Sequence, residues 1–380
     1  MAKLGEVCKV SPSTKNIERQ GAWLLNLDMV EQQTGRVIEY KYVGEDDLNG
    51  SIIQFDTENV LYSKLRPNLN KVVLPQKDGF STSELLPLRP DARVLNRDYL
   101  AVFLRSDSFV TWAVSKTAGA KMPRLGTKDL MNAEIPVPTI EQQKKIAEKF
   151  KKLEQLIFLR KQQLAKLDEL VKARFVEMFG DAKLNPNNLP CCSLSEYIVF
   201  LTSGSRGWSQ YFTDSGEYFI TIKNVKNCKI TLQDVQCVTP PDNAEAKRTR
   251  VQENDLLISI TADLGRTGIV TKKIAEHGAY INQHLTCIRL KQDKLNPLYV
   301  AYYMESDAGK EQFIAKNQSA VKAGLNFNAI NSLKLMVPPL ALQNQFAAFV
   351  ERVDQQKQTV QQSLEKLELM KKALMQEYFG

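Results

Sequence analysis

The feature that most constrains the fold of this chain is an internal repeat of about 200 residues within its 380 residues. The stretch IPVPTIEQQKKIAEKF at 135–150 has a counterpart at 335–350, LMVPPLALQNQFAAFV. Both run from an apolar stretch through proline into a long periodic segment. Aligning 141–180 with 341–380 gives 12 identities without a gap. A period this long indicates a duplicated domain rather than a solenoid of short repeats.

The repeat extends upstream of these segments. Residues 88–107 match 288–307 at the same shift, whereas 59–74 match 255–270 with a shift that differs by a few residues. Loops of unequal length on a shared scaffold explain such a drift. The predicted division is a first globular domain at 1–138, a long helix at 139–180, a linker at 181–189, a second globular domain at 190–338 and a C-terminal long helix at 339–380.

Each globular domain is expected to combine short strands, turns and one helix. Runs such as NVLYSKL at 59–65 and DLLISI at 255–260 have the composition of strands. The segments 97–117 and 297–317 are predicted to be helical. The predicted fold class is therefore α+β, with two similar domains of mixed β-sheet and helix.

The two long helices carry apolar residues at alternating steps of three and four, which is the heptad pattern of a coiled coil. Basic residues interrupt this seam at Arg160, Arg174, Lys357 and Lys371, and such long side chains can extend out of it to a carboxylate on the facing helix. The seam residues are Phe150, Leu153, Ile157, Leu164, Leu167 and Val171 in the first helix and Val350, Val353, Val360, Leu364, Leu367 and Leu374 in the second.

The apolar stripe of each long helix needs cover in water, and the other helix carries a complementary stripe. We expect the two helices to pair antiparallel, with the globular domains at opposite ends and an internal pseudo-twofold axis. Gly180 can end the first helix in the left-handed conformation. The alternative is that each helix folds back onto its own globular domain.

Composition favours a polyanionic partner, because the net charge is +8. Residues 141–180 hold ten Lys or Arg and six Asp or Glu, whereas 341–380 hold five of each. The six cysteines form no Cys-x-x-Cys pair and are expected to be reduced thiols, and with only two histidines in the chain we expect no zinc site. No apolar run of about 18 residues and no signal core is present, so we expect no membrane span and a cytoplasmic location.

With these motifs established, the sequence resembles the specificity subunits of type I restriction–modification systems. The resemblance rests on the duplicated junctions IPVP…EQQKKIAE and MVPP…LQNQFAAF, on the helix ends MFG and YFG, and on segments such as LYSKLRPNLNKV and INQHLTCIRL. It implies two target-recognition domains joined by an antiparallel coiled coil. Such a subunit would read a bipartite, asymmetric double-stranded DNA target, one half per domain, without catalytic chemistry of its own.

The resemblance also implies the partners. Two methyltransferase subunits and, for cleavage, restriction subunits would assemble on this chain. No cofactor is expected on the chain itself, while S-adenosylmethionine, ATP and magnesium would be bound by those partners.

Candidate DNA contacts are basic, amide and hydroxyl side chains in loops beside strands, which suit phosphates and base edges. Asn282 and Gln283 match the paired donor and acceptor of adenine. For Trp208 the alternatives are stacking on DNA and packing in the core. For the charged loop candidates the alternative is that they are simply solvated. The candidates are Lys64, Arg66, Asn68, Asn70, Lys71, Lys121 and Arg124 in the first domain, and Ser203, Ser205, Arg206, Trp208, Arg266, Thr267, Asn282, Gln283, His284, Lys322 and Asn326 in the second.

Motifs of catalysis and nucleotide binding are missing from the sequence. It has no Walker loop, no strand-associated Gly-x-Gly-x-x-Gly and no Asn-Pro-Pro-aromatic motif. Asp242, Glu245 and Lys247 stand in a nuclease-like order, but too close together for carboxylates on adjacent strands to converge on a metal. We therefore expect no enzyme activity. The competing hypotheses are an unrecognised nuclease or transferase site and a coiled-coil adaptor that binds protein only.

Overall fold

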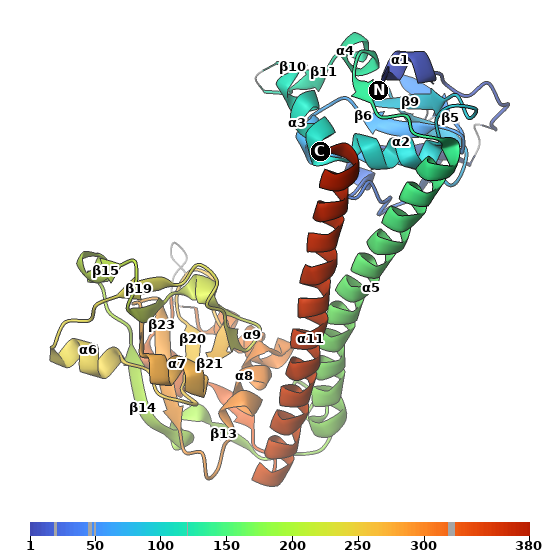
Figure 1. Ribbon diagram of the computed structural model, residues 1–380. Helices are drawn as coiled ribbons and strands as arrows, with labels where there is room; N and C mark the ends of the chain where they lie inside the picture. The colour runs from blue at the N-terminus through green and yellow to red at the C-terminus, as the bar shows by residue number, and fades with distance from the viewer. Residues whose placement is uncertain (19–20, 45–47, 49–50, 120, 318–323) are drawn as a thin grey trace. The chain divides into compact units, whose positions relative to one another are not determined.

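The computed structural model describes residues 1–18, 21–44, 48, 51–119, 121–317 and 324–380. The chain divides into two compact units, one formed by residues 1–162 with 360–380 and the other by 163–359. Each unit contains one globular domain, the first part of one long helix and the last part of the other. Figure 1 shows both domains and both helices in chain order.

The first globular domain contains two four-stranded sheets. One has the order β2-β9-β6-β7 and is antiparallel, and the other has the order β4-β3-β8-β5 with β3 and β8 parallel. The elements are β1 (Ala2–Lys3), α1 (Leu4–Val7), β2 (Cys8–Val10), β3 (Ala22–Leu25), η1 (Leu27–Met29), β4 (Lys41–Val43), β5 (Ile52–Phe55), β6 (Val60–Ser63), η3 (Pro67–Leu69), β7 (Val72–Val73), β8 (Gly79–Thr82), β9 (Leu85–Pro90), α2 (Arg97–Leu104), α3 (Asp107–Ser115), β10 (Thr117–Ala118), β11 (Arg124–Leu125), α4 (Thr127–Met131) and β12 (Glu134–Ile135).

The second domain repeats this plan. Its sheet β14-β23-β20-β21 has the antiparallel pairing of β2-β9-β6-β7, and its sheet β15-β19-β16-β22 contains one parallel pair, β16 with β22. The elements are β13 (Cys191–Ser193), η4 (Leu194–Tyr197), β14 (Ile198–Ser203), η5 (Trp208–Tyr211), β15 (Phe212–Thr213), β16 (Glu217–Ile220), η6 (Ile222–Asn224), β17 (Val225–Lys226), β18 (Lys229–Ile230), β19 (Gln236–Val238), α6 (Ala244–Thr249), β20 (Leu256–Ser259), β21 (Thr267–Ile269), α7 (Lys272–His277), β22 (Ala279–Ile281), β23 (Leu285–Leu290), α8 (Pro297–Glu305), α9 (Asp307–Ala315), α10 (Phe327–Asn331) and β24 (Lys334–Met336).

The single helices predicted at 97–117 and 297–317 are each broken in two, so that prediction was wrong. Ser106 separates α2 from α3, and its hydroxyl oxygen accepts a hydrogen bond from the Phe109 amide at 3.3 Å. Ser306 caps α9 in the same way through the Gly309 amide at 3.4 Å. A serine cap satisfies free amides of the new helix, and the apolar pattern that continues through it hides the break.

The long helices are α5 (Ile140–Phe179) and α11 (Leu340–Phe379), each of 40 residues. In the first unit Glu154 pairs with Lys371 at 2.9 Å and Lys161 with Glu368 at 3.0 Å. The residue number rises on α5 as it falls on α11, so the two segments run antiparallel. The ring of Phe175 contacts that of Phe346 in the second unit, where Lys357 pairs with Asp168, in the same sense. The predicted antiparallel pairing is confirmed within each unit.

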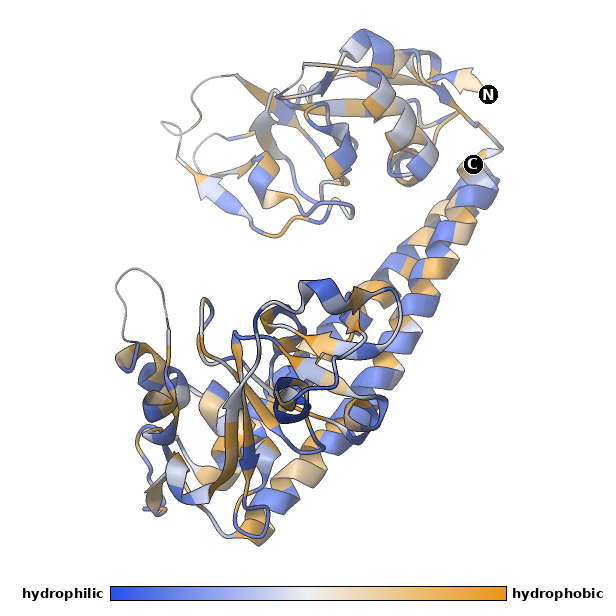
Figure 2. Cartoon of the chain, turned by 90° about the vertical axis from the view of Figure 1, so that its left-hand side faces the viewer, coloured by the Kyte–Doolittle hydropathy of each residue, from blue (hydrophilic) through white to orange (hydrophobic). Residues whose placement is uncertain are grey.

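Hydrophilic residues alternate with hydrophobic ones along both long helices (Figure 2). Lys357 and Lys371 each bind a carboxylate of the facing helix, as predicted, whereas Arg174 pairs with Glu177 of its own helix at 2.8 Å. Gly180 ends α5 with a left-handed φ of 81°. Phe150, Leu153, Val171, Val350, Val353, Val360 and Leu364 are buried, and Ile157, Leu164, Leu167, Leu367 and Leu374 are half-buried.

A buried glutamine attaches the start of each long helix to its globular domain. The Gln143 amide nitrogen donates to the carbonyl oxygens of Val94 (2.9 Å) and Pro138 (2.8 Å), and its side-chain oxygen accepts from the Asn96 amide (2.7 Å). Gln343 makes the same three bonds at the positions 200 residues later. Both glutamines are fully buried.

The end of each long helix packs on the other globular domain. The ring of Phe379 lies 5.4 Å from that of Tyr99 in the first unit, and the ring of Phe179 lies 4.7 Å from that of Tyr299 in the second. Each domain is therefore held by the start of one helix and the end of the other. None of the helices within the described ranges is both long and apolar enough to cross a membrane.

Candidate nucleic-acid interface

Loops that are distant in the sequence meet at one end of the sheet β2-β9-β6-β7. The Lys64 amide donates to the Glu84 carbonyl oxygen at 3.0 Å, and the Leu125 amide donates to the Lys64 carbonyl oxygen at 2.9 Å. Leu65 forms a bridge with Arg124. These bonds join the loop 64–71, the turn 83–84 and the β10–β11 hairpin, which together we call the tip of the first domain.

The second domain builds its tip with the same backbone bonds. The Ile260 amide donates to the His284 carbonyl oxygen at 3.0 Å, and the Leu325 amide donates to the Ile260 carbonyl oxygen at 2.9 Å. Thr261 forms a bridge with Gly324. Position 84 therefore corresponds to 284, 124 to 324, and 65 to 261. We call the loop 260–266, the turn 282–284 and residues 324–325 the tip of the second domain.

Several predicted contacts lie together on the surface of the first tip. Lys64 and Arg124 line one hollow of about 550 Å³, together with Lys116. Nε of Arg124 lies 3.1 Å from a carboxylate oxygen of Glu84. The side chains of Arg66, Asn68 and Lys121 are exposed on the same loop and hairpin. Sequence reasoning missed Lys116 and Glu84, although Glu84 could have been found by its correspondence with His284.

Two predicted contacts of the first domain are used inside it instead. Asn70 is buried, and its amide donates to the Arg105 carbonyl oxygen at 3.1 Å. The Lys71 ammonium donates to the Leu27 carbonyl oxygen, and burial lowers the pKa of Lys71 against the opposing effect of Asp28. The prediction that Asn70 contacts DNA is therefore corrected. Both side chains stabilise the loop 64–71 that carries the exposed residues.

In the second domain, two predicted contacts belong to the core. Trp208 is 3% exposed and stacks on Phe219, with ring centroids 5.4 Å apart, and contacts Tyr280 at 4.9 Å. Of the two readings of Trp208, core packing is the one that the structure supports. Thr267 is fully buried, and its hydroxyl donates to the Ala301 carbonyl oxygen at 3.3 Å. The prediction that both contact DNA is corrected, because both side chains are buried and pack or bond inside the domain.

The loop 203–207 is pressed against the turn 282–284. Ser205 pairs with Asn282 through the backbone, and both side chains are buried. A Cβ atom on Gly204 would lie 2.1 Å from the Asn282 carbonyl oxygen, so only glycine fits there. The Asn282 side-chain oxygen accepts from the His284 amide at 3.2 Å. Ser205 and Asn282 thus shape the tip, and their prediction as DNA contacts is corrected.

Gln283 and His284 are half-buried at the second tip and form a short polar chain. Nδ1 of His284 lies 2.6 Å from Oγ1 of Thr261, and its Nε2 lies 3.0 Å from Nε2 of Gln283. This arrangement fixes the Gln283 amide at the surface. Sequence reasoning missed Thr261, which the repeat aligns with Leu65.

Other predicted residues of the second domain lie around this tip. Arg206 is exposed, and Nε of Arg266 donates to an Asp263 carboxylate oxygen at 2.6 Å. The Ser203 carbonyl oxygen accepts a hydrogen bond from Arg248 at 2.9 Å, and Arg248 is an exposed cation that was not predicted.

The remaining two predicted DNA contacts are Asn326 and Lys322. The side-chain oxygen of Asn326 accepts from the Ala329 amide at 2.8 Å and so caps α10. Lys322 lies outside the described residues.

The residues that could ligate a metal and those of the nuclease-like motif can be located in the structure. Within the described part of the chain, no three His, Cys, Asp or Glu side chains gather as metal ligands. The six cysteines are free thiols, and burial raises the pKa of Cys8 to about 12. Asp242 pairs at 3.1 Å with Lys247, and both are largely exposed.

Comparison with known sequences finds one matching family model and several related proteins. Residues 1–169 and 207–369 match the family model described as type I restriction modification DNA specificity domain. The type I restriction enzyme MjaVIII specificity subunit of Methanocaldococcus jannaschii is 21% identical over 326 residues, 81% of this chain and 75% of that protein. The EcoDI specificity subunit of Escherichia coli is 26% identical over 124 residues, 33% of this chain and only 27% of that protein.

Solved structures share the fold. The type-I restriction-modification system S subunit from M. genitalium matches with a TM-score of 0.60 at 15% identity, over 100% of this chain and 95% of that one. A chain from a structure described as the basis of complex assembly and conformational transition of the type I R-M system also gives 0.60, at 18% identity, over 100% and 96%. At these identities the likeness concerns the fold alone.

Proposed function

The chain belongs to the family of type I restriction modification DNA specificity domains, whose model matches most of its length, and we propose that it selects the DNA sequence on which a type I restriction–modification complex acts. The family is named for specificity and not for catalysis. In this proposal the chain reads a bipartite, asymmetric duplex target, with one recognition domain on each half.

The observation that carries the proposal is a duplicated frame with unlike side chains at its tips. Corresponding backbone bonds hold Glu84 and His284, while Arg124 has only Gly324 opposite it in the repeat. A protein with true twofold symmetry reads a palindrome. Two domains with the same backbone arrangement but different side chains at their tips favour a DNA target with two different halves.

Exposed cations around the first tip supply the other requirement for DNA binding. Contacts to phosphates position a protein on the duplex, and contacts to base edges specify the sequence. Arg66 and Lys121 are exposed, and Lys64 and Lys116 line the hollow beside Arg124. These four suit the phosphate role, and the net charge of +8 has the sign that a polyanion requires.

The antiparallel helices are proposed to set the spacing of the two half-sites and to present the surface that two methyltransferase subunits bind. A helix of 40 residues is about 60 Å long, and successive turns of DNA on one face are about 34–36 Å apart. S-adenosylmethionine would be bound by the methyltransferase subunits, and ATP and magnesium by restriction subunits that join them.

Mapping of methylated bases in genomic DNA by single-molecule sequencing tests this proposal. The host would be compared with a strain in which this chain is deleted and with the complemented strain. We expect one bipartite motif with unlike halves to lose methylation on deletion and to regain it on complementation. Methylation that is unchanged in the deletion strain would contradict the proposal, as would methyl transfer or DNA cleavage by the purified chain alone.

A further inference from the structure

At the tip of the first domain a carboxylate holds a guanidinium group in a fixed place. Nε of Arg124 lies 3.1 Å from Oε1 of Glu84, and the side chains are 45% and 24% exposed. The other oxygen of Glu84 is buried and makes no hydrogen bond with any described residue. Glu84 therefore faces the interior of the domain while Arg124 faces outward.

The bond through Nε determines which atoms Arg124 can offer to a ligand. Its Nη1 makes one long contact, 3.5 Å, with the Met122 carbonyl oxygen. Among the described residues no hydrogen bond is formed by Nη2, and Nη1 keeps a second hydrogen, so the two terminal nitrogens can act as a planar fork. A fork of this kind bonds simultaneously to O6 and N7 of guanine, which is the commonest specific contact in the major groove. An arginine already held in one orientation loses less side-chain entropy in that contact.

The corresponding place in the second domain has different chemistry. Gly324 stands opposite Arg124 in the repeat and has no side chain. His284 replaces Glu84 and bonds to Thr261 and Gln283. The amide of Gln283 offers the donor and acceptor that suit adenine. The same frame therefore presents an arginine fork in one copy and an amide in the other.

The cations around Arg124 have a separate role. Lys64 and Lys116 line the same hollow, and Asp129 is the carboxylate that lines it with them. Both ammonium groups suit phosphates, which carry no sequence information. Arg124 differs from them because a carboxylate fixes its direction.

We infer that Arg124 reads a guanine in the half-site of the first domain, with Glu84 as its positioning residue. This inference rests on the proposed function, and it adds the identity of a base and the side chain that reads it. Glu84 acts through Arg124 and not on the base, because its remaining oxygen is buried.

The test uses the full chain assembled with the methyltransferase subunits of its host, and it begins from the methylated motif of the wild type. Binding to duplexes with each base at each half-site position is measured at one salt concentration. We expect one guanine in one half-site whose replacement weakens binding about 5- to 150-fold. Gln283→Ala should change the base preference at the other half-site. The half-site whose preference stays unchanged is then the one that the first domain reads.

Three variants separate reading from folding and from charge. Arg124→Lys keeps the charge but loses the fork, so the preference for guanine should largely disappear while the other positions stay unchanged. Arg124→Gln should move the preference toward adenine. Glu84→Gln should reduce the preference for guanine with an unchanged melting temperature, which a purely structural role would not produce. Lys121→Ala, a cation of the same hairpin, is the control and should weaken all duplexes equally.

The inference is overturned if the half-site of the first domain lacks guanine, or if both Arg124 variants keep the wild-type preference. The failure of the proposed function has a different signature, because then no methylated motif would depend on the chain at all. If a methylated motif depends on the chain and both folded Arg124 variants still keep its guanine, the inference fails while the proposed function stands.

Discussion

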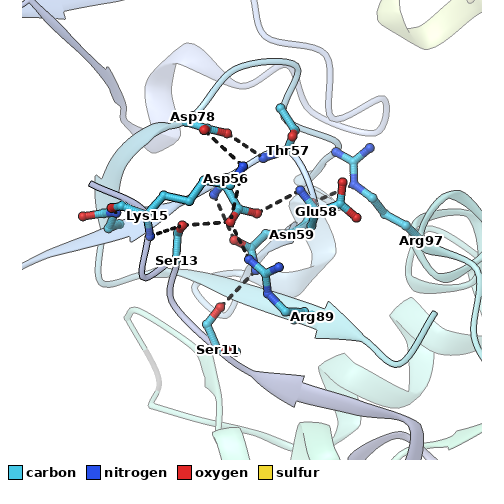
Figure 3. Close-up of polar contacts among 11 residues, drawn as sticks. Ser11, Ser13, Lys15, Asp56, Thr57, Glu58, Asn59, Asp78, Arg89 and Arg97 are labelled. Atoms are coloured by element: carbon cyan, nitrogen blue, oxygen red, sulfur yellow. Dashed lines mark hydrogen bonds and ion pairs between the residues drawn. The ribbon is translucent and has the colours of Figure 1, made fainter. Parts of the chain in front are cut away.

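At the scale of single residues, buried polar groups decide how the loops of each domain are held. Asp56 joins several segments of the first domain (Figure 3). Its carboxylate accepts hydrogen bonds from the Ser13 hydroxyl (2.8 Å), from Nη2 of Arg89 (2.6 Å) and from the Glu58 amide (2.9 Å). Burial alone would raise the pKa of Asp56, but these bonds outweigh it and lower the pKa below its ordinary value.

The lowered pKa of Asp56 predicts a pH-dependent contribution to stability. The contribution is complete above the unfolded pKa of about 3.9 and is lost as the pH falls through the folded pKa. Asp56→Asn should therefore lower the free energy of unfolding at pH 7 by about 1.5–3 kcal/mol. The difference from wild type should shrink below about pH 4. Urea unfolding at several pH values measures it.

The matched control for Asp56 is Asp293→Asn, since the Asp293 side chain is 74% exposed. It should leave the unfolding free energy nearly unchanged at every pH. Equal effects of the two substitutions would contradict the role given to the buried carboxylate.

Gln143 gives a second prediction at the residue scale. Gln143→Ala removes three hydrogen bonds from buried backbone groups, which costs about 2–4 kcal/mol of stability. Hydrogen exchange of the peptide that contains Asn96 should accelerate, because the Asn96 amide loses its acceptor. Gln155→Ala, on the exposed face of α5, should leave this exchange unchanged. Unchanged protection of Asn96 in the Gln143 variant would show that the glutamine does not hold the helix start.

At the scale of elements, charge inside the helix seam connects the helices to the first domain. Glu154 of α5 binds Lys371 of α11 at 2.9 Å and Arg105 of the globular domain at 3.0 Å. Burial would raise the pKa of Glu154, but the two cations more than reverse this and lower it. The Arg105 side chain is only 7% exposed, and this carboxylate is its counter-charge.

Removal of the Glu154 carboxylate should be far more costly than removal of an exposed one. Glu154→Ala leaves the Arg105 guanidinium buried without a counter-charge and should lower the unfolding free energy by about 2–4 kcal/mol. Glu148→Ala, which breaks an exposed pair with Lys152, should change it by less than about 0.5 kcal/mol. Chemical denaturation of both variants provides the comparison. Similar decreases in the unfolding free energy of the two variants would mean that Glu154 contributes no more than an exposed ion pair does.

The long helices were predictable because a heptad pattern of 40 residues, with proline before it and glycine after it, has few other solutions. The break at Ser106 was not, because the apolar spacing continues through the cap. Residue type and local sequence also did not distinguish polar side chains that are buried from those that are exposed at the surface. Asn70 and Thr267 have the residue types of a DNA contact but satisfy buried backbone groups. The role of Glu84 could not be predicted from the sequence, because its ion pair with Arg124 forms only in the folded domain.

At the scale of the whole molecule, the repeat explains why two recognition domains need both helices. Gln143 and Phe379 hold the first domain, and Gln343 and Phe179 hold the second. Each domain depends on the start of one long helix and the end of the other, and these two segments lie far apart in the sequence. The attachment is equivalent in both copies, whereas the tips differ, so under the proposed function each domain should read its half-site independently of the other.

The central claim is that one duplicated frame carries two independent readers, and an exchange of domains tests it most directly. In the chimera, residues 192–338 are replaced by a second copy of 2–138, so that the pair Ala2–Ile135 of the inserted copy takes the place of the equivalent pair Cys192–Leu335. The chimera is expressed with the host methyltransferase in the deletion strain, and methylated motifs are mapped by single-molecule sequencing. The account predicts an inverted repeat of the first half-site, because a symmetric protein reads a symmetric target. A methylated motif that keeps the second half-site of the wild type would contradict it.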